Sequence, residues 1–342
     1  MASITAVITT YNFEHEITKL LDSLFTQSFQ DFKVLLIDDC SNDKTVDVVK
    51  MYITNFPDRI DAIFLQKNMG IGSLLWNIAL DSGKIKSNYV IFLDGDDYAE
   101  QDFFGTLFKL STETQADISV CAYDRREAVT GRILCEEMKR FPPIINLPDD
   151  ISMLPFINTA LWNKLIKTSI IGSTRSNYDT GSFDVCFIMR LYQKCERIAF
   201  TDEVLFHYQV RTGSIMNTMK PMYAYLVADE LREIYVQCID SSYKNMLMLT
   251  AFIHIGISIP VRLNNNPQVS IKDHLLWTRS HFIYNYNYFK DCKLMKLFSL
   301  RRFGTKGYGV WICYVLYKLN IFRFFLFMYK SITMLLHRDI KW

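Results

Sequence analysis

Short apolar runs alternate with helical patterns over residues 3–121. Five runs rich in β-forming residues predict strands, at 4–9, 33–37, 61–65, 89–93 and 118–121. Apolar residues recur at helical spacing in three of the segments between them, at 17–25, 46–53 and 103–108. Ser41 or Asn42 is expected to cap the second of these helices. The alternation predicts an α/β fold with a mainly parallel sheet and helices on both faces.

The rest of the chain has a different pattern. Four prolines between positions 142 and 155 make the segment that follows the predicted sheet irregular. From about Met222 to the end the pattern is mostly helical, with interruptions expected at Asn264–Pro267 and Gly304–Gly309. The predicted boundaries are about 1–121 and 122–220 for the two halves of a first domain, and 221–342 for a helical C-terminal region.

The chain has a net charge of only +2, but its basic and acidic residues are distributed unevenly along the sequence. Residues 290–342, here called the tail, hold 11 basic and 2 acidic residues, so the preceding 289 residues carry a net charge of −7. Two aromatic and aliphatic stretches of the tail, Gly309–Tyr317 and Ile321–Tyr329, are too short to span a bilayer. They favour helices lying in the interface of an anionic membrane. A buried C-terminal helix or an oligomer contact would give the same pattern.

Other features bear on the cellular compartment. The first residues lack a basic stretch before their apolar run, so we do not expect a signal peptide. Eight cysteines occur without C-x-x-C pairs or Cys/His ligand spacing, which predicts reduced, mostly buried thiols in a reducing cytosol. Asn245–Val261 is uncharged but contains Pro260, and it is predicted to be a buried core helix rather than a membrane span.

Polar groups follow three of the predicted parallel strands, at Thr9–Asn12, Asp38–Ser41 and Asp94–Asp97. The carboxyl ends of such strands meet at one edge of a sheet, where ligands bind. Asp94 and Asp96, with a glycine between them, can present hard oxygen ligands to one divalent cation. Simpler interpretations stay open, namely a helix cap for Asp38 or Asp39 and a solvated Asp-Gly turn. Tyr11 could stack on a base, and Asp39 could accept from its imino N–H.

Several nucleotide-binding classes are not supported. No G-x-G-x-x-G follows the first strand, and no G-x-x-x-x-G-K-[ST] occurs, which argues against a dinucleotide dehydrogenase and a P-loop NTPase. Thr10–Phe13 is not the glycine-rich, basic loop expected of a nucleotidyltransferase. We expect no nucleic-acid partner.

Seven segments, taken in order, resemble the GT-A fold glycosyltransferases of family 2, which build bacterial surface polysaccharides. The resemblance covers about residues 3–218 and implies a Rossmann-like GT-A domain with a nucleotide-binding half and an acceptor half. The segments are Val7–Asn12, Ile37–Asp43, Asn68–Gly70, Phe92–Asp97, Ala160–Lys167, Phe183–Asp184 and Val204–Ile215.

The resemblance implies a role for each matching position. Asp94 and Asp96 would form the D-x-D pair that holds Mn²⁺ or Mg²⁺, with Asp96 in direct contact and His207 nearby. Asp184 would be the catalytic base. The positions implied for the nucleoside, normally uridine, are Thr9, Tyr11, Asn12, Asp38, Asp39, Asn68 and Gly70. Arg211 and Ser214 would contact the diphosphate, and Trp162 and Lys164 the sugars, unless Trp162 is a core residue and His207 a packing histidine.

Two positions depart from the family pattern. Leu75–Asn77 stands where the family has an Arg-Asn pair, which leaves the donor base open, and Phe183 replaces a glutamate before Asp184. The expected function is metal-dependent, inverting transfer from a nucleotide diphosphate sugar to a saccharide or lipid-linked acceptor, peripherally at the cytoplasmic face of a membrane. The alternative is a non-catalytic nucleotide-sugar-binding subunit, against which Asp96 and Asp184 both argue.

Overall fold

The computed structural model describes residues 2–177, 184–211, 221–266 and 268–336 of the 342-residue chain. The chain forms two compact units. Met1–Asp150 and Ile157–Arg211 make up the first, and Ile151–Phe156 and Thr212–Trp342 make up the second. The short 3-10 helix η1, Ile151–Phe156, therefore leaves the first unit to pack within the second, which the sequence pattern did not indicate.

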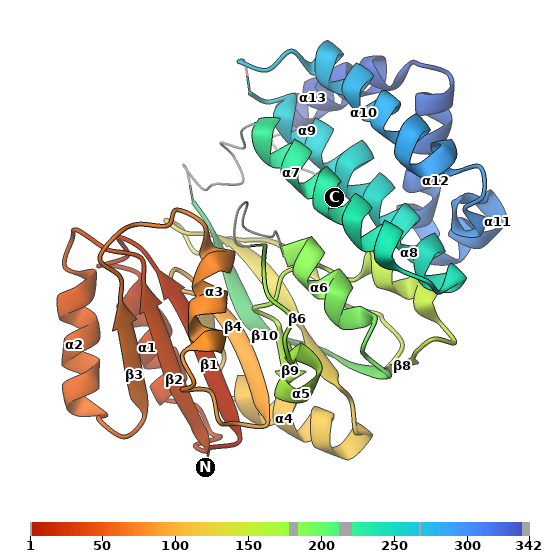
Figure 1. The fold of residues 1–342 in the computed structure, drawn as a ribbon. Coiled ribbons are helices and arrows are strands. Elements are labelled where there is room, and N and C mark those ends of the chain that lie inside the picture. The colour runs from red at the N-terminus through yellow and green to blue at the C-terminus, as the bar shows by residue number, and fades with distance from the viewer. Residues whose placement is uncertain (1, 178–183, 212–220, 267, 337–342) are drawn as a thin grey trace. The chain divides into compact units, whose positions relative to one another are not determined.

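A mixed sheet forms the centre of the first unit (Figure 1). Its order is β3-β2-β1-β4-β9-β6-β10-β5, with β7 paired to β6 and β8 to β10. The first four strands are mutually parallel, β6 and β10 are parallel to each other, and β9 runs antiparallel between β4 and β6. The predicted α/β class is confirmed. The bounds are β1 Ile4–Thr10, β2 Phe32–Asp38, β3 Ile60–Phe64, β4 Tyr89–Asp94, β5 Tyr98–Ala99, β6 Ile118–Glu127, β7 Ile133–Glu137, β8 Ile144–Asn146, β9 Lys164–Lys167 and β10 Arg197–Val210.

Helices cover both faces of this sheet, because right-handed crossovers on either side of β1 lead to opposite faces. Figure 1 shows α3 and α6 in front of the strands. There Trp76 packs against Phe92 and Phe187, with ring centroids 5.3 and 5.7 Å apart. The helices of this unit are α1 Ile17–Phe25, α2 Thr45–Asn55, α3 Gly72–Asp81, α4 Phe103–Thr114, α5 Thr168–Ile171 and α6 Asp184–Tyr192.

The expected cap of α2 is wrong. The helix begins at Thr45, after Lys44, and the carboxylate of Asp43, rather than Ser41 or Asn42, accepts from the backbone N–H of Thr45 at 2.9 Å. Ser41 instead accepts a hydrogen bond from the backbone N–H of Asn12 and donates one to Asp38. Its hydroxyl is therefore used to join the loops that follow β1 and β2.

The register of the parallel strands places the polar strand ends side by side. Thr10 of β1 pairs with Asp38 of β2, and Thr9 pairs with Asp94 of β4. The chain connections diverge on the two sides of β1, which is the topological switch point where ligands of open α/β sheets bind.

The second unit is mostly helical, as predicted. Its core is aromatic, and the ring of Phe252 contacts those of Phe282, Phe289, Tyr314 and Tyr317. The helices are α7 Pro221–Gln237, α8 Ser241–Ala251, the π-helix η3 Phe252–Ser258, α9 Ile259–Leu263, α10 Ile271–Tyr286, η4 Asn287–Phe289, η5 Lys293–Met295, α11 Leu297–Leu300, η6 Arg301–Phe303, α12 Gly304–Lys318 and α13 Phe322–Leu336.

One helical stretch, Ser241–Leu263, is long and apolar enough to cross a membrane, and 78% of its apolar window is buried inside the protein. It is the only such stretch among the described residues. Its π-helical part accommodates Pro260, whose ring would otherwise clash with the carbonyl of Gly256 four residues earlier. That carbonyl accepts a hydrogen bond from the hydroxyl of Tyr317 at 2.8 Å.

The second expected interruption of the helical region, Gly304–Gly309, is right only at its first residue. Gly304, with φ +57°, separates η6 from α12, and the following residues continue α12. The chain instead breaks into short turns between α10 and α12. A Cβ atom added to Gly307 would stand 1.9 Å from the carbonyl oxygen of Leu300. Gly307 therefore permits a close backbone approach rather than a break in the helix.

Replacing Gly307 with alanine should destabilise the second unit by about 1–3 kcal/mol, because the backbone of Leu300 must move to admit a methyl group. Thermal denaturation of the two proteins measures the difference. Gly105→Ala in α4 is the matched control, since its added Cβ would find its nearest neighbour at 3.6 Å. Equal stability of Gly307→Ala and wild type would contradict the packing argument.

Candidate active site at the carboxyl ends of β1, β2 and β4

Asp39 joins the end of β2 to the turn at residues 68–70. One of its carboxylate oxygens accepts from the backbone N–H of Met69 at 2.7 Å, and the other from that of Gly70 at 3.0 Å. Asn68 donates its side-chain amide to the carbonyl of Asp39 at 3.0 Å. Gly70 has φ +69°, which favours glycine. Three of the positions predicted for the nucleoside are therefore in direct mutual contact.

The exposed ring of Tyr11 fits the predicted stacking role, since 41% of this residue is accessible to solvent. Asp38 and Asn12, by contrast, use their side chains to hold loops. The buried carboxylate of Asp38 accepts from the backbone N–H of Ser41 at 2.9 Å, and the side-chain oxygen of Asn12 accepts from that of Asn42 at 2.9 Å. Asp38 and Asn12 therefore hold the loops of this sheet edge, and their contact with a donor stays a prediction.

The segment Asp94–Asp97 brings three carboxyl groups to the end of β4. Asp94 and Asp96 are partly exposed, whereas Asp97 is fully buried and accepts from the backbone N–H of Gln209 at 2.8 Å. The second oxygen of Asp97 is buried without a hydrogen-bond partner in the described part of the chain. A Cβ atom on Gly95 would lie 2.9 Å from the ring of Phe13, so only glycine lets this turn pack closely.

The electrostatics of this cluster show that its carboxyl groups are crowded. Burial, together with the charges of Asp96 and Asp184, raises the pKa of Asp94 to about 8. Burial and the charges of Asp96 and Asp94 raise the pKa of Asp97 well above its ordinary value. The structure thus brings Asp184, the predicted base at the start of α6, within electrostatic range of the predicted metal pair.

Arg211, directly after β10, is the cation of this cluster. Its guanidinium forms a short ion pair with Asp96 and a second with Glu16 at 3.1 Å. It also lies 4.7 Å from the centroid of the Phe13 ring. Sequence reasoning missed Phe13 and Glu16. Both follow β1 within six residues, so the strand-end rule could have included them.

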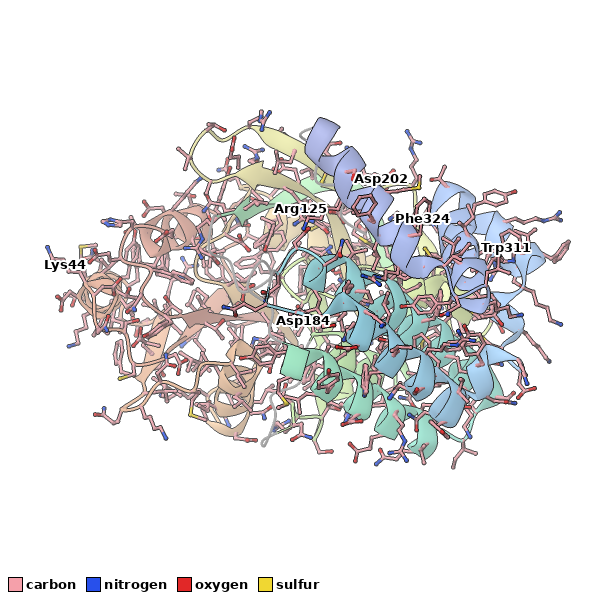
Figure 2. The ribbon with its side chains drawn as sticks, turned by 90° about the horizontal axis from the view of Figure 1, so that it is seen from above. Lys44, Arg125, Asp184, Asp202, Trp311 and Phe324 are labelled. Atoms are coloured by element: carbon pink, nitrogen blue, oxygen red, sulfur yellow. The ribbon has the colours of Figure 1, made fainter. Side chains whose placement is uncertain are left out.

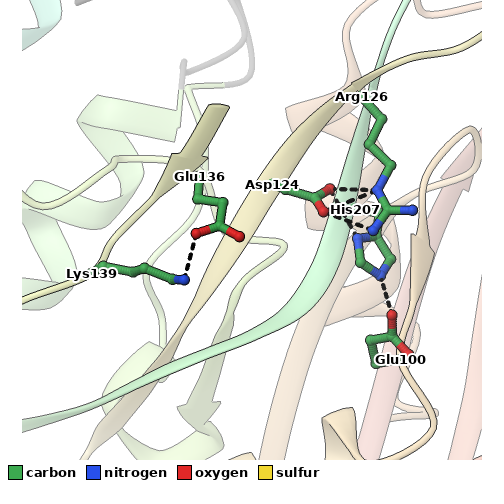
Figure 3. A network of polar contacts seen from close by, with 6 residues as sticks. All are labelled: Glu100, Asp124, Arg126, Glu136, Lys139 and His207. Carbon is green, nitrogen blue, oxygen red and sulfur yellow. Dashed lines mark hydrogen bonds and ion pairs between the residues drawn. The ribbon is translucent and has the colours of Figure 1, made fainter. Parts of the chain in front are cut away.

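His207 does not lie free to bind a metal, which corrects the prediction made for it. Its Nδ1 hydrogen-bonds to Asp124 at 2.9 Å and its Nε2 to Glu100 at 2.8 Å (Figure 3). Arg126 binds the same carboxylate of Asp124 through two nitrogens. Since both ring nitrogens are occupied and the residue is only 1% exposed, His207 links β10 to neighbouring elements. It is the packing histidine that the sequence left as an alternative.

Trp162 is also a core residue rather than a sugar platform. Its ring stacks with those of Phe206 and Tyr208, at 5.1 and 5.6 Å between centroids, and meets Tyr123 edge-on at 4.4 Å. With its faces covered and 7% exposed, it offers no platform to a sugar.

Lys164 lies in the interior and does not reach a sugar in this structure. Its ammonium donates to the carbonyl of Ala160 at 2.7 Å and to the side-chain oxygen of Asn163 at 2.8 Å. Burial lowers its pKa to about 7, while the charges of Cys121 and Asp184 act in the opposite direction. Lys164 is fully buried and its ammonium is paired inside the protein, so the predicted sugar contact is not seen in this structure.

Asn77, in the segment that lacks the family's arginine, anchors a loop. Its amide nitrogen donates to the carbonyl of Ser176 at 2.8 Å, and its oxygen accepts from the N–H of Ser176 at 2.8 Å. Ser214 and Phe183, both named by the sequence analysis, lie outside the described residues.

Comparisons with known proteins agree with this geometry. Residues 5–169 match the model of glycosyl transferase family 2. GlyA of Streptococcus pneumoniae is 28% identical over 239 residues, which are 67% of this chain and 34% of GlyA. TarS of Staphylococcus aureus, a poly(ribitol-phosphate) β-N-acetylglucosaminyltransferase, is 25% identical over 286 residues, 78% of this chain and 48% of TarS. Residues 5–169 are thus identified with glycosyl transferase family 2, and these relatives of the chain are glycosyltransferases.

Solved structures extend the likeness of this chain to the fold. TarS 1–349 in complex with UDP-GlcNAc superposes with a TM-score of 0.70 at 20% identity, covering 94% of this chain and 92% of that one. A mannosyltransferase of Pyrobaculum calidifontis, in complex with GDP-Man and Mn²⁺, gives a TM-score of 0.55 at 14% identity, covering 93% and 87%. The chain spans between a third and a half of the length of GlyA and TarS.

The residues present fit a divalent cation that takes part of its ligands from a substrate. The described residues contain no group of three or more His, Cys, Asp or Glu side chains arranged to hold a metal. Asp94 and Asp96 nevertheless offer hard oxygen ligands in a crowded acidic cluster, and one buried oxygen of Asp97 is unpaired. One or two carboxylates completed by substrate phosphates and water are typical of Mg²⁺ sites.

Asp94→Asn should stabilise the metal-free protein at high pH. Because the folded pKa of Asp94 is raised to about 8, its contribution to stability is lost as pH rises from 3.8, the ordinary value, toward 8. Removing the ionisable group should raise the free energy of unfolding by about 1 kcal/mol or more at pH 8.5. Denaturant titrations with chelator, at pH 6 and 8.5, measure it. No gain at pH 8.5 would show that the cluster is not strained by charge.

Proposed function

We propose that this glycosyltransferase moves a sugar from a nucleotide diphosphate donor, with uridine as the base, to a hydroxyl of a saccharide or lipid-linked acceptor in cell-surface polysaccharide synthesis. The observation that carries the proposal is the meeting of Asp94, Asp96, Asp184 and Arg211 at the ends of β1 and β4. The similar fold of TarS 1–349 with UDP-GlcNAc supports the choice of donor.

In this proposal Asp184 accepts the proton of the acceptor hydroxyl as that oxygen attacks the anomeric carbon. Attack from the face opposite the nucleotide, in one displacement, inverts the configuration of that carbon. Arg211 offers a planar, permanently charged group to the leaving diphosphate. A divalent cation held by Asp94 and Asp96 would supply further charge stabilisation to that diphosphate.

Asp184→Asn separates chemistry from binding. The amide cannot accept the proton, so transfer should fall on the order of 10²-fold or more while the affinity for donor and Mn²⁺ changes little. Product release from a panel of UDP- and GDP-sugars, together with calorimetric donor binding, measures both quantities. Asp58→Asn, on an exposed surface, is the matched control. Undiminished transfer by Asp184→Asn would remove it as the base. Donor binding without transfer by the wild type would favour the non-catalytic subunit.

We also propose that the tail places the enzyme on an anionic membrane at the cytoplasmic face. The helices α12 and α13 each have one face in the core of the second unit, through Val310, Tyr317 and Leu326. Their other faces are rich in exposed apolar side chains, and Figure 2 labels Trp311 and Phe324 on them. The exposed apolar residues are Tyr308, Ile312, Leu319, Ile321, Phe324, Phe327 and Met328, and exposed basic residues near them are Arg301, Arg302, Lys306, Lys318 and Arg323.

This surface supports interfacial binding. Basic side chains near an anionic surface contribute about 1 kcal/mol each to the binding free energy. Buried aromatic rings add a hydrophobic contribution that salt does not screen. The buried inner faces also mean that deleting the tail would expose the core. Point substitutions are therefore the cleaner test.

The double change Phe324→Ser and Phe327→Ser should weaken sedimentation with anionic vesicles without lowering thermal stability. These two residues are 65% and 68% exposed, so little core packing is lost. Wild-type binding should be stronger to anionic than to neutral vesicles and should decrease at high salt. Tyr284→Ser, an 85% exposed aromatic position on α10, is the control. If the double variant binds as well as the wild type, the membrane proposal is wrong.

A further inference from the structure

Arg211 is held by three side chains of the site. It pairs with Asp96 and with Glu16, and it lies over the ring of Phe13. Its charge lowers the pKa of Asp94, Asp96 and Asp97 alike, against the effect of burial. In this metal-free state Arg211 thus supplies the positive charge that the carboxylate cluster requires.

We propose that Glu16 and Phe13 form a holding position for Arg211, in which Arg211 is the counter-ion of Asp96 until a divalent cation and a diphosphate displace it. This inference rests on the proposed function. Glu16 is then a positioning residue, which acts on the donor through Arg211 and sets how tightly the cation binds.

The displacement follows from charge and geometry. The guanidinium touches the carboxylate of Asp96, the predicted metal contact, and a divalent ion bound there would repel it at short range. The backbone before Arg211 belongs to β10, and in this proposal the side chain makes the movement. Phe13 is itself held in place, because its ring packs on Gly95. The holding position is therefore built into the loop after β1.

Two possible roles of Glu16 predict opposite changes in the affinity for the divalent cation when Glu16 is neutralised. Glu16 adds negative charge to the surroundings of Asp96, since its charge raises the pKa of that carboxyl. If Glu16 only added negative charge near the cation, its neutralisation would weaken cation binding. If it holds Arg211 on Asp96, its neutralisation destabilises the metal-free state, and cation binding becomes tighter.

Glu16→Gln should therefore bind Mn²⁺ about two- to fivefold more tightly than the wild type, the range expected for losing one partly exposed ion pair. Binding of Mn²⁺ alone, followed by electron paramagnetic resonance of the free ion, needs no turnover. The fold should persist, because Glu16 precedes α1 without capping it through its side chain. Glu14→Gln is the matched control, with the same loss of charge two residues away and with an amide oxygen that can still accept from Lys44.

Arg211→Gln provides a second, independent signature. It should also bind Mn²⁺ more tightly, because the competing cation is gone, yet bind UDP in the presence of Mn²⁺ more weakly, because the diphosphate loses its partner. Equal or weaker Mn²⁺ binding by Glu16→Gln overturns the holding position while leaving the proposed function intact. Failure of the wild type to bind UDP in a Mn²⁺-dependent way overturns both.

Discussion

Repulsion among carboxyl groups at the ends of β1 and β4 is the constraint on which the site depends. Burial and the neighbouring carboxylates raise the pKa of Asp94 and Asp97, and the charge of Asp184 adds to this effect on Asp94. In the metal-free state the fold offsets this with Arg211 and by favouring the protonated form of Asp94. In the proposed function, a divalent cation would relieve the same repulsion.

The rest of the sheet edge is built to keep this cluster in place. Asp38, Asn12 and Ser41 join the loops after β1 and β2, and Asp39 fastens the turn at residues 68–70. On the other side, His207 and Gln209 of β10 bind the segments around β5 and β6. These polar side chains fix the backbone around the carboxylate cluster.

Local patterns predicted the strands of the nucleotide half, because fully buried parallel strands are continuous apolar runs, as in Ile4–Thr10. Strand-end position predicted Asp94 and Asp96, and resemblance added Asp184 and Arg211. The errors have one physical origin: sequence position does not show what a side chain is paired with. His207, Trp162 and Lys164 occupy matching positions, yet tertiary contacts bury them. The sequence predicted a helix break around Gly307, because it does not show that the backbone of Leu300 packs against this glycine.

The most direct test of the central claim is an anomalous diffraction map of the crystalline enzyme with UDP and Mn²⁺. The account predicts one Mn²⁺ peak bonded to a carboxylate oxygen of Asp96, a diphosphate oxygen on the same ion, and the guanidinium of Arg211 moved from Asp96 to the diphosphate. A map with UDP bound, Arg211 still paired with Asp96 and Glu16, and no Mn²⁺ at the cluster would contradict it.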